Sequence, residues 1–395
     1  MKCPCRLVKN GFYSSFLEIE KMTLQETFAD FPDWRKGPAV RYTLSEIIIM
    51  AICGILCGAN NWVEVNNWCK DRSEWLKQRF GFGNGIPSHD TFGDVFSLLD
   101  AKQFEQRFRT WMNALAGIVE GVVALDGKTL RGSGSKGGNE LMHMVTAYAT
   151  ESGLCLAQEG TQGKGNELAG MKTLLDMLAL KGCIVTMDAL GCQTELAEKI
   201  IARGGDYVLQ VKDNQKNLAE VLREFFEQGQ QAGFGSLKVE RLEHVEKDHG
   251  RLETRRYTWI NDISWMDKEM RKSWKKLGGV GMIESVRQTG EKISTEVHYS
   301  IGSCGISTVD MFAKASRAHW GIENKLHWVL DVVFREDNCR ARTGNSARNF
   351  SVLRKFVLTA LRKEEAPKRS LNGRRILADR DADYREFLLD LAFAA

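Results

Sequence analysis

Hydrophobic residues recur at helical spacing through the first part of the chain. An apolar run covers residues 47–59, and Trp62 and Val65 continue the pattern at an interval of three. A period near 3.6 is typical of buried and amphipathic helices. We therefore predict a helical region over residues 25–117, preceded by an extension, residues 1–24, that we expect to be disordered.

From residue 118 the pattern changes to short apolar runs. The strings "GVVALD", "GCIVTMD" and "GDYVLQV" each predict a buried strand, and the first two end at Asp126 and Asp188. Amphipathic stretches at 166–180 and 195–203 predict helices between the strands. This alternation indicates an α/β protein with a mixed sheet, whose first part we place at residues 118–215.

A second change of pattern follows that region. Residues 216–310 begin with a helix and then alternate between apolar and polar side chains, as in "LKVERLEHVEK", which predicts a β-rich insertion. Helical spacing returns over residues 311–363, where we expect the second part of the mixed-sheet core. Residues 364–395 form a basic helical tail, which we interpret either as a solvated surface or as a phosphate-binding one.

The composition restricts the possible functions of the chain. A net charge of +4 means that binding to a polyanion must come from local patches. The ten cysteines are scattered and include no C-x-x-C pair, which indicates free thiols in a reducing compartment. The longest apolar run is too short to span a bilayer, so we expect no membrane association and a cytoplasmic protein.

Three acidic residues are candidates for the chemistry: Asp126 and Asp188 at strand ends, and Glu323 on a later helix. Mg²⁺ and Mn²⁺ prefer carboxylate oxygens, and two such ions can clamp the attacking and leaving oxygens of a phosphoryl transfer. The alternative for each aspartate is a turn-capping role. The string Gly-Lys-Thr after Asp126 does not complete a P-loop, because Val122 stands where the first glycine is needed.

Five segments resemble the bacterial H-repeat-associated transposases of the DDE superfamily: "VVALDGKTLRGS", "TMDALGCQTELAEKI", "GGDYVLQVKDNQKNL", "DHGRLETRRY" and "RAHWGIENKLHWVLDVVFRED". The resemblance implies an RNase H-like core with a β insertion, preceded by a helical domain. It implies Asp126, Asp188 and Glu323 as the catalytic, metal-binding triad for two Mg²⁺ or Mn²⁺ ions.

The same resemblance implies an activity and partners. The activity would be cleavage of DNA at the ends of an insertion sequence, followed by transfer of the freed 3′ end into target DNA. The partner would be double-stranded DNA, both terminal inverted repeats and target. A homodimer on DNA, at the bacterial nucleoid, is the corresponding assembly.

The segment around Glu323 departs from related cut-and-paste transposases. Their Y-x-x-R-x-x-x-E-x-x-x-x-x-x-K signature would place tyrosine, arginine and lysine at Ser316, His319 and Leu330. The phosphate contacts of that arginine and lysine therefore do not carry over, and Arg317 or Lys325 are candidate substitutes. His319 and His327 share a helix face with Glu323, where we interpret them as neighbours of the ligand or as contacts to DNA.

Basic and aromatic residues near these acids are candidates for DNA contact. Lys128, Arg131 and Lys212 follow strand ends, where they could face phosphates or belong to a solvated loop. Arg251, Arg255 and Trp259 combine charge with a stacking surface, unless they form only the solvent face of a β ribbon. The DNA-binding set is Lys128, Arg131, Lys212, Arg251, Arg255, Trp259, His319 and Lys325.

Two structural expectations and two rival functions complete the predictions. We expect Trp320 and Trp328 to pack in the core, and the nearby acids Asp331, Glu336 and Asp337 to pair with Arg335, Arg340 and Arg342. The rival functions are an RNase H-like nuclease that cleaves without joining, and a catalytically silent DNA-binding protein descended from a transposase.

Overall fold

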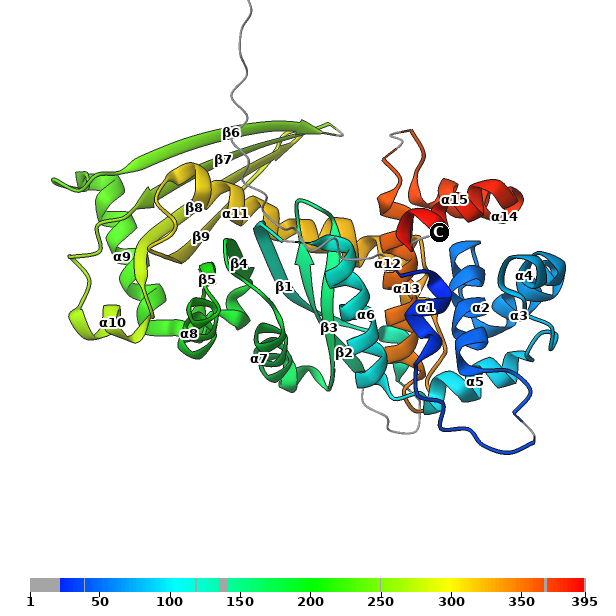
Figure 1. The fold of residues 1–395 in the computed structure, drawn as a ribbon. Coiled ribbons are helices and arrows are strands. Elements are labelled where there is room, and N and C mark those ends of the chain that lie inside the picture. The colour runs from blue at the N-terminus through cyan, green and yellow to red at the C-terminus, as the bar shows by residue number, and fades with distance from the viewer. Residues whose placement is uncertain are drawn as a thin grey trace, which may run out of the picture.

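The computed structural model describes residues 22–38, 40–117, 119–134, 141–248, 250–365 and 368–393. Almost all of the extension predicted at residues 1–24 lies outside the described residues. Helices occupy one end of the molecule and a long, curved sheet occupies the rest (Figure 1).

The N-terminal region folds into helices whose starts are set by local capping. Thr23 and Glu26 form a capping box at the first helix, and Thr43 and Glu46 form another at the second. The helices are α1 (Leu24–Ala29), α2 (Leu44–Leu56), α3 (Trp62–Asp71), α4 (Ser73–Phe80), α5 (His89–Leu98) and α6 (Ala101–Ala116). Helix α2 is buried on nearly its whole circumference, so it needs partners on every side.

The C-terminal helices supply several of those partners. Helices α13 (Ser346–Lys363), α14 (Leu371–Arg380) and α15 (Ala382–Ala392) share one hydrophobic core with α1–α6 (Figure 1). The expectation of a solvated or phosphate-binding basic tail is wrong for Arg375 and Arg385, each 2% exposed. Arg375 donates to the carbonyls of Ile55 and Ala59 at the end of α2. These guanidinium groups cap buried carbonyls and are not available to DNA.

Within the described residues, nine strands form one sheet in the order β3-β2-β1-β4-β5-β9-β8-β7-β6. The strands are β1 (Gly121–Thr129), β2 (Met142–Ala149), β3 (Leu154–Gln162), β4 (Cys183–Met187), β5 (Asp206–Val211), β6 (Glu240–Asp248), β7 (Arg251–Ile260), β8 (Leu277–Thr289) and β9 (Lys292–Ser303). Strands β1–β3 form an antiparallel meander, and β4 and β5 run parallel to β1. This is an RNase H-like arrangement, and the predicted fold class is confirmed.

Helices cover both faces of the first five strands. Helices α7 (Glu167–Met177), α8 (Thr194–Ala202) and α9 (Lys216–Ala232) lie on one face, where they share a hydrophobic core with Val123 and Leu125 of β1. Helix α11 (Val309–Ile322) packs on the other face, where Val122 is buried with Phe312. The alternation along β1 therefore places Asp126 on the α11 face and Gly127 on the α7 face.

The β insertion extends the core sheet. Strand β9 pairs with β5, so β6–β9 continue the sheet as an arm that reaches away from the helical end (Figure 1). The short helix α10 (Lys268–Ser273) connects β7 to β8. The sequence predicts the antiparallel insertion, but its hydrogen bonding to β5 depends on a partner strand far along the chain.

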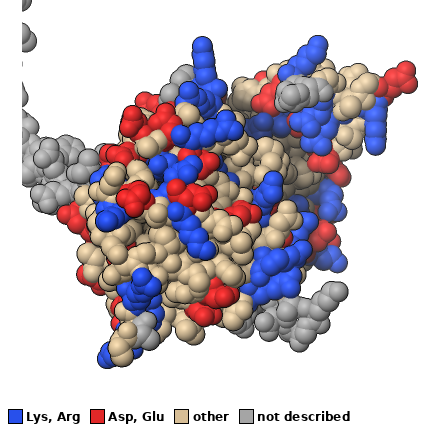
Figure 2. All heavy atoms as spheres, turned by 90° about the vertical axis from the view of Figure 1, so that its right-hand side faces the viewer, with Lys and Arg blue, Asp and Glu red and all other residues tan. Residues whose placement is uncertain are grey.

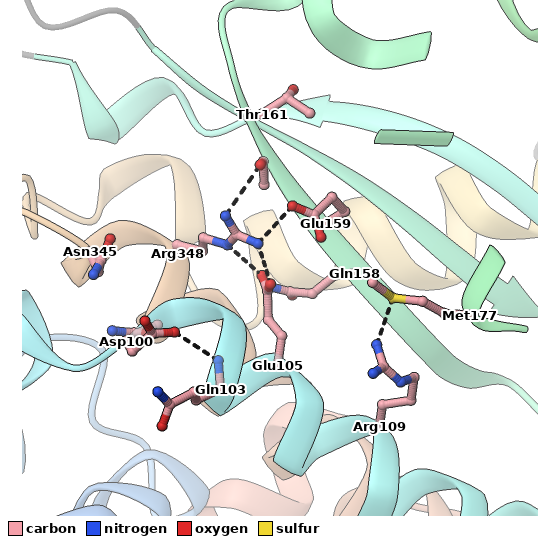
Figure 3. A network of polar contacts seen from close by, with 12 residues as sticks. Asp100, Gln103, Glu105, Arg109, Gln158, Glu159, Thr161, Met177, Asn345 and Arg348 are labelled. Atoms are coloured by element: carbon pink, nitrogen blue, oxygen red, sulfur yellow. Dashed lines mark hydrogen bonds and ion pairs between the residues drawn. The ribbon is translucent and has the colours of Figure 1, made fainter. Parts of the chain in front are cut away.

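A buried polar network fixes the helical end to the sheet. Arg348 of α13 donates to Glu105 of α6 at 2.7 Å and to Glu159 of β3 at 2.9 Å (Figure 3). Gln158 donates to the same Glu105 carboxylate at 2.9 Å and accepts from Lys355. Because each buried charge has a partner of opposite sign or a polar one, the interface is specified by more than apolar contact.

Candidate functional site

Asp126 lies inside β1, between β2 and β4, and the strand continues to Thr129, so the prediction that this strand ends at Asp126 is wrong. Asp126 is 9% exposed, and its Oδ1 accepts a hydrogen bond from the Gly127 amide at 2.8 Å. The apolar residues before it form the strand, and strand alternation turns its carboxylate toward α11.

Glu323 reaches Asp126 from a π-helical turn. Helix α11 ends at Ile322, residues Glu323–His327 form one π-helical turn (η5), and α12 (Trp328–Val332) follows. Such single turns inside α-helices occur frequently at functional sites. His327 Nδ1 is 3.6 Å from Asp126 Oδ2 and 3.5 Å from Glu323 Oε2. One ligand atom from each of the three residues lies within 4.8 Å of the others.

The pKa values of Asp126 and Glu323 reflect two carboxylates that lie close together. Burial and the facing Glu323 carboxylate raise the pKa of Asp126. The hydrogen bond from His327 lowers the pKa of Glu323. The Glu323 side chain is 53% exposed and Asp126 is buried, so the two carboxylates meet at the edge of the solvent. Two carboxylates that face each other repel, and a bound cation would relieve that repulsion.

Asp188 lies beside this group and not within it. It directly follows Met187 of β4, and Met187 is the register partner of Leu125, so Asp188 stands about one strand spacing from Asp126. Its Oδ1 accepts from the Gly191 amide at 3.4 Å, which caps the short 3₁₀ turn η3 (Ala189–Gly191). Burial raises the pKa of Asp188, and the charge of Glu167 adds to that increase.

The donor set fits a divalent cation. Asp126, Glu323 and Asp188 offer the carboxylate oxygens that Mg²⁺ and Mn²⁺ prefer, and His327 adds a borderline nitrogen. His327 Nε2 is buried without a hydrogen-bond partner in the described structure. Asp126, Glu323 and Asp188 could hold divalent ions, with His327 as a neighbour of the two carboxylates.

Lys128 is engaged in buried ion pairs and does not face solvent. Its Nζ contacts Glu336 at 2.7 Å and also pairs with Asp331. The same Glu336 carboxylate is 3.5 Å from Arg354. The predicted DNA contact of Lys128 is therefore wrong. The predicted pairing of Asp331, Glu336 and Asp337 with Arg335, Arg340 and Arg342 is also wrong, since Asp337 lies 3.5 Å from Arg131.

The candidate DNA-contact residues in the β insertion mostly contact other protein side chains. Trp259 is 0% exposed and stacks on Phe312 of α11, so the prediction that it stacks on bases is wrong. Arg255 pairs with Glu253 at 2.7 Å and Glu246 at 2.9 Å. Arg251 is 3.4 Å from Glu253 and stays partly exposed.

The side chains around Glu323 on its helix have other surroundings than predicted. His319 Nδ1 lies 3.1 Å from the Thr186 hydroxyl, and burial lowers the pKa of the ring to about 4, so the side chain is neutral near pH 7. Its predicted DNA contact stays a prediction. Trp320 and Trp328 are 55% and 58% exposed, so their predicted core packing is wrong. Of the remaining DNA-binding candidates, Arg131, Lys212 and Lys325 are exposed.

Sequence reasoning missed two residues near the site, His143 of β2 and Glu167 at the start of α7. His143 Nε2 is 3.2 Å from Glu167 Oε2, and both residues are buried. One signal was present in the sequence: Gly127 directly follows Asp126, and a glycine inside a strand marks close approach of other groups.

Comparisons with known proteins identify the family. Residues 25–112 match the DDE_Tnp_1-associated family, and residues 118–360 match the family described as Transposase DDE domain. The chain is 38% identical to "Putative transposase YncI" of Escherichia coli O157:H7, over 86% of this chain and 87% of that one. It is 35% identical to "H repeat-associated putative transposase YhhI" of Escherichia coli strain K12, over 93% and 97%.

Two further findings describe the chain as a whole. A piggyBac transposase synaptic complex with hairpin DNA superposes with a TM-score of 0.42 and 12% identity, over 96% of this chain and 78% of that chain. In the part of the chain that the structure describes, no helix combines the length and apolar character needed to cross a membrane. From the matched residues and the extent of the identity, the chain belongs to the DDE transposase family, with H-repeat-associated relatives.

Proposed function

We propose that this chain is a metal-dependent DNA transposase that cleaves DNA at insertion-sequence ends and joins the freed 3′ ends to target DNA. The observation that carries the proposal is the approach of Asp126 and Glu323 from distant elements to within metal-binding reach, with Asp188 one strand away. This occurs inside the segment that matches the transposase domain.

In the proposal, Asp126, Asp188 and Glu323 hold two Mg²⁺ or Mn²⁺ ions. The bound ions would supply charge stabilisation for the attacking and leaving oxygens of an in-line displacement. His327 would orient the Glu323 carboxylate through its Nδ1 contact. The rigid placement of these side chains in β1, after β4 and on a π-helical turn preorganises the site.

Double-stranded DNA is the proposed partner, as terminal inverted repeats and as target, bound by a homodimer. The candidate contacts are the exposed Arg131, Lys212 and Lys325, together with Arg251 where it remains partly exposed. Exposed basic residues contribute sequence-independent affinity for phosphates. Over the helical end of the molecule, basic and acidic side chains are interspersed (Figure 2).

The test replaces Asp188 by Asn, which keeps the shape of the side chain and removes one negative charge. Cleavage of terminal-repeat DNA with Mg²⁺ should fall by orders of magnitude, because an amide is a weak ligand for a hard cation. DNA affinity without divalent metal should hold or rise slightly. Asp213→Asn, an exposed change of the same charge after β5, is the matched control and should cleave normally.

The outcomes separate this proposal from its rivals. Normal cleavage by the Asp188 variant would leave only a turn-capping role. Loss of binding together with cleavage, in a folded variant, would assign Asp188 to DNA recognition. Wild-type cleavage without covalent strand-transfer product would favour the nuclease, and binding without cleavage would favour the silent DNA-binding protein.

A further inference from the structure

The arm β6–β9 has one face toward α11 and a second face turned away from it. Trp259 of β7 is buried against α11, so alternation along this strand turns Thr254 and Arg256 to the second face. Helix α9 covers the second face near the core, where Phe226 stacks on Tyr299 of β9 with ring centroids 5.8 Å apart. Farther along the arm, the second face carries exposed side chains.

Large apolar side chains gather on this exposed part, which we call the outer arm face. Those that are more than a third exposed are Val245 at 57%, Leu252 at 39%, Ile293 at 62% and Val297 at 43%. Exposed apolar patches with a polar rim commonly mark interaction surfaces. The outer arm face is therefore a candidate docking surface.

The strand register arranges the outer arm face in three rows of directly opposed residues. The middle row is Val245, Thr254, Val286 and Thr295. One flanking row is Glu243, Arg256, Glu284 and Val297. The other flanking row is Lys247, Leu252, Gln288 and Ile293. The middle row is uncharged and β-branched throughout, which is typical of a sheet face that packs against another layer.

The three rows are complementary to a second copy of themselves. A two-fold axis along the middle row, between two facing sheets, places each strand opposite the same strand of the partner and exchanges the flanking rows. Glu243 then faces Lys247 of the partner subunit, and Val297 faces Ile293 of the partner subunit. The first flanking row has one acid in excess and the second has one lysine, so the net charges of the facing rows are opposite.

We propose that the outer arm face is the interface between two copies of this chain. The charges of the three rows cancel, which suits a second copy better than polyanionic DNA. The α11 side of the arm, where Arg251 and Glu323 lie, stays free in such a dimer. The inference locates the homodimer of the proposed function and rests on that proposal for its role, but not on its chemistry.

The size of the outer arm face predicts how strong the dimer is. Four strands about 4.8 Å apart and three rows about 7 Å apart cover roughly 400 Å² per copy. Stable interfaces bury about 800 Å² per partner, so this one alone gives a weak, concentration-dependent dimer. DNA that binds both copies would strengthen it by raising their effective concentration.

The test exchanges the two facing charges and measures mass by sedimentation equilibrium of the full chain, without DNA or divalent metal. The mass of wild type should rise with concentration from 44.6 kDa toward twice that value. Lys247→Glu and Glu243→Lys should each weaken the dimer by at least about 10-fold, because like charges then meet twice. An equimolar mixture of the two variants should restore it, because every facing pair is again of opposite charge.

A second pair of variants tests the apolar contact. Ile293→Lys should weaken the dimer by at least about 10-fold, because it places a charge in the interface. Ser294→Lys, an exposed neighbour on the opposite face of β9, is the matched control and should keep the dimer. Thermal unfolding should be unchanged in both, since both side chains are exposed.

Each remaining outcome has one meaning. A wild-type chain that stays monomeric up to millimolar concentration would overturn the inference, as would a dimer that none of the variants weakens. Failure of the mixture to restore the dimer would refute the two-fold arrangement. Ile293→Lys with unchanged mass and altered DNA affinity would assign the face to DNA. A wild-type dimer that does not cleave terminal-repeat DNA would refute the proposed function and leave this interface standing.

Discussion

At the scale of single residues, Lys128 shows why a basic side chain beside an acidic site need not contact phosphate. Its two carboxylate partners, Asp331 and Glu336, lie 203 and 208 positions away in sequence. The side chain of Glu336 is 1% exposed, and although burial alone would raise its pKa, Lys128 and Arg354 lower it to about 2. Lys128 therefore connects β1 to α12 and to the segment that follows it.

Lys128→Met should destabilise the fold by about 3–5 kcal/mol, because it leaves buried carboxylates without their main partner. Urea unfolding measures the change. Arg131→Met, whose side chain is 80% exposed, should change stability by no more than about 0.5 kcal/mol and serves as the control. If the two variants are equally stable, the ion pairs of Lys128 do not hold the fold together, and Lys128 is again a candidate for DNA contact.

His319 should make the protein sensitive to moderate acid. Its folded pKa, about 4, is below the unfolded value near 6.5, so between these pH values the unfolded chain binds a proton that the folded chain does not. Stability from this group is complete above pH 6.5 and is lost as the pH falls toward 4.

At pH 5 the loss from His319 is about 2 kcal/mol. The measurement is urea unfolding at pH 7 and pH 5 in chelator. His319→Gln cannot titrate, so the difference between the two pH values should shrink by about that amount. An unchanged difference would mean that other groups carry the acid sensitivity.

Residue identity alone could predict part of the site. Asp126, Asp188 and Glu323 stand out because acids at strand ends and within a family-like segment are visible in the sequence. The burial of Trp259 is not visible, because it depends on Gly279 and Gly302 of other strands: a Cβ at either position would clash with the indole. The sequence pattern does not show contacts between residues that are far apart along the chain.

At the scale of elements, the arm β6–β9 is joined to the core by the pairing of β9 with β5 and by the packing of Trp259 against α11. The indole stacks on Phe312, with ring centroids 4.9 Å apart, and Gly281 gives Phe312 its space. Strand alternation predicts the insertion correctly. The alternation does not predict which face of the arm is buried, since both faces of this ribbon carry aromatic and charged residues.

Trp259→Ala should cost about 3–5 kcal/mol of stability, because it leaves a cavity between the arm and α11. Trp320→Ala should cost no more than about 0.5 kcal/mol, since this indole is more than half exposed. Thermal unfolding of both variants makes the comparison. If Trp259→Ala unfolds like wild type and loses DNA affinity instead, the indole contacts DNA as the sequence suggested.

At the scale of the whole molecule, the helical end is built from both ends of the described chain. Helices α1–α6 and α13–α15 share one core, and Arg375 of α14 caps the end of α2. The sequence could predict the helices of this body from their periodicity. The sequence could not predict that the two sets of helices pack together, because periodicity shows which face of a helix is apolar and not which other helix covers that face.

The fragment 22–117 should therefore not fold cooperatively alone. Its α2 would expose an apolar surface that α13 and α14 cover in the full chain, and a helix that is apolar all round needs such cover. Circular dichroism should show helix without a sharp thermal transition, and addition of the fragment 346–393 should restore one. A sharp transition of 22–117 alone would contradict a shared core.

The π-helical turn that carries Glu323 also has a consequence for timing during synthesis. On the ribosome, Asp188 is made about 135 residues before Glu323, which at roughly 5–20 residues per second is about 7–27 s. Throughout that interval the two aspartates have no partner from the Glu323 turn. A growing chain would thus carry no assembled Asp126–Glu323 site until most of it has been translated.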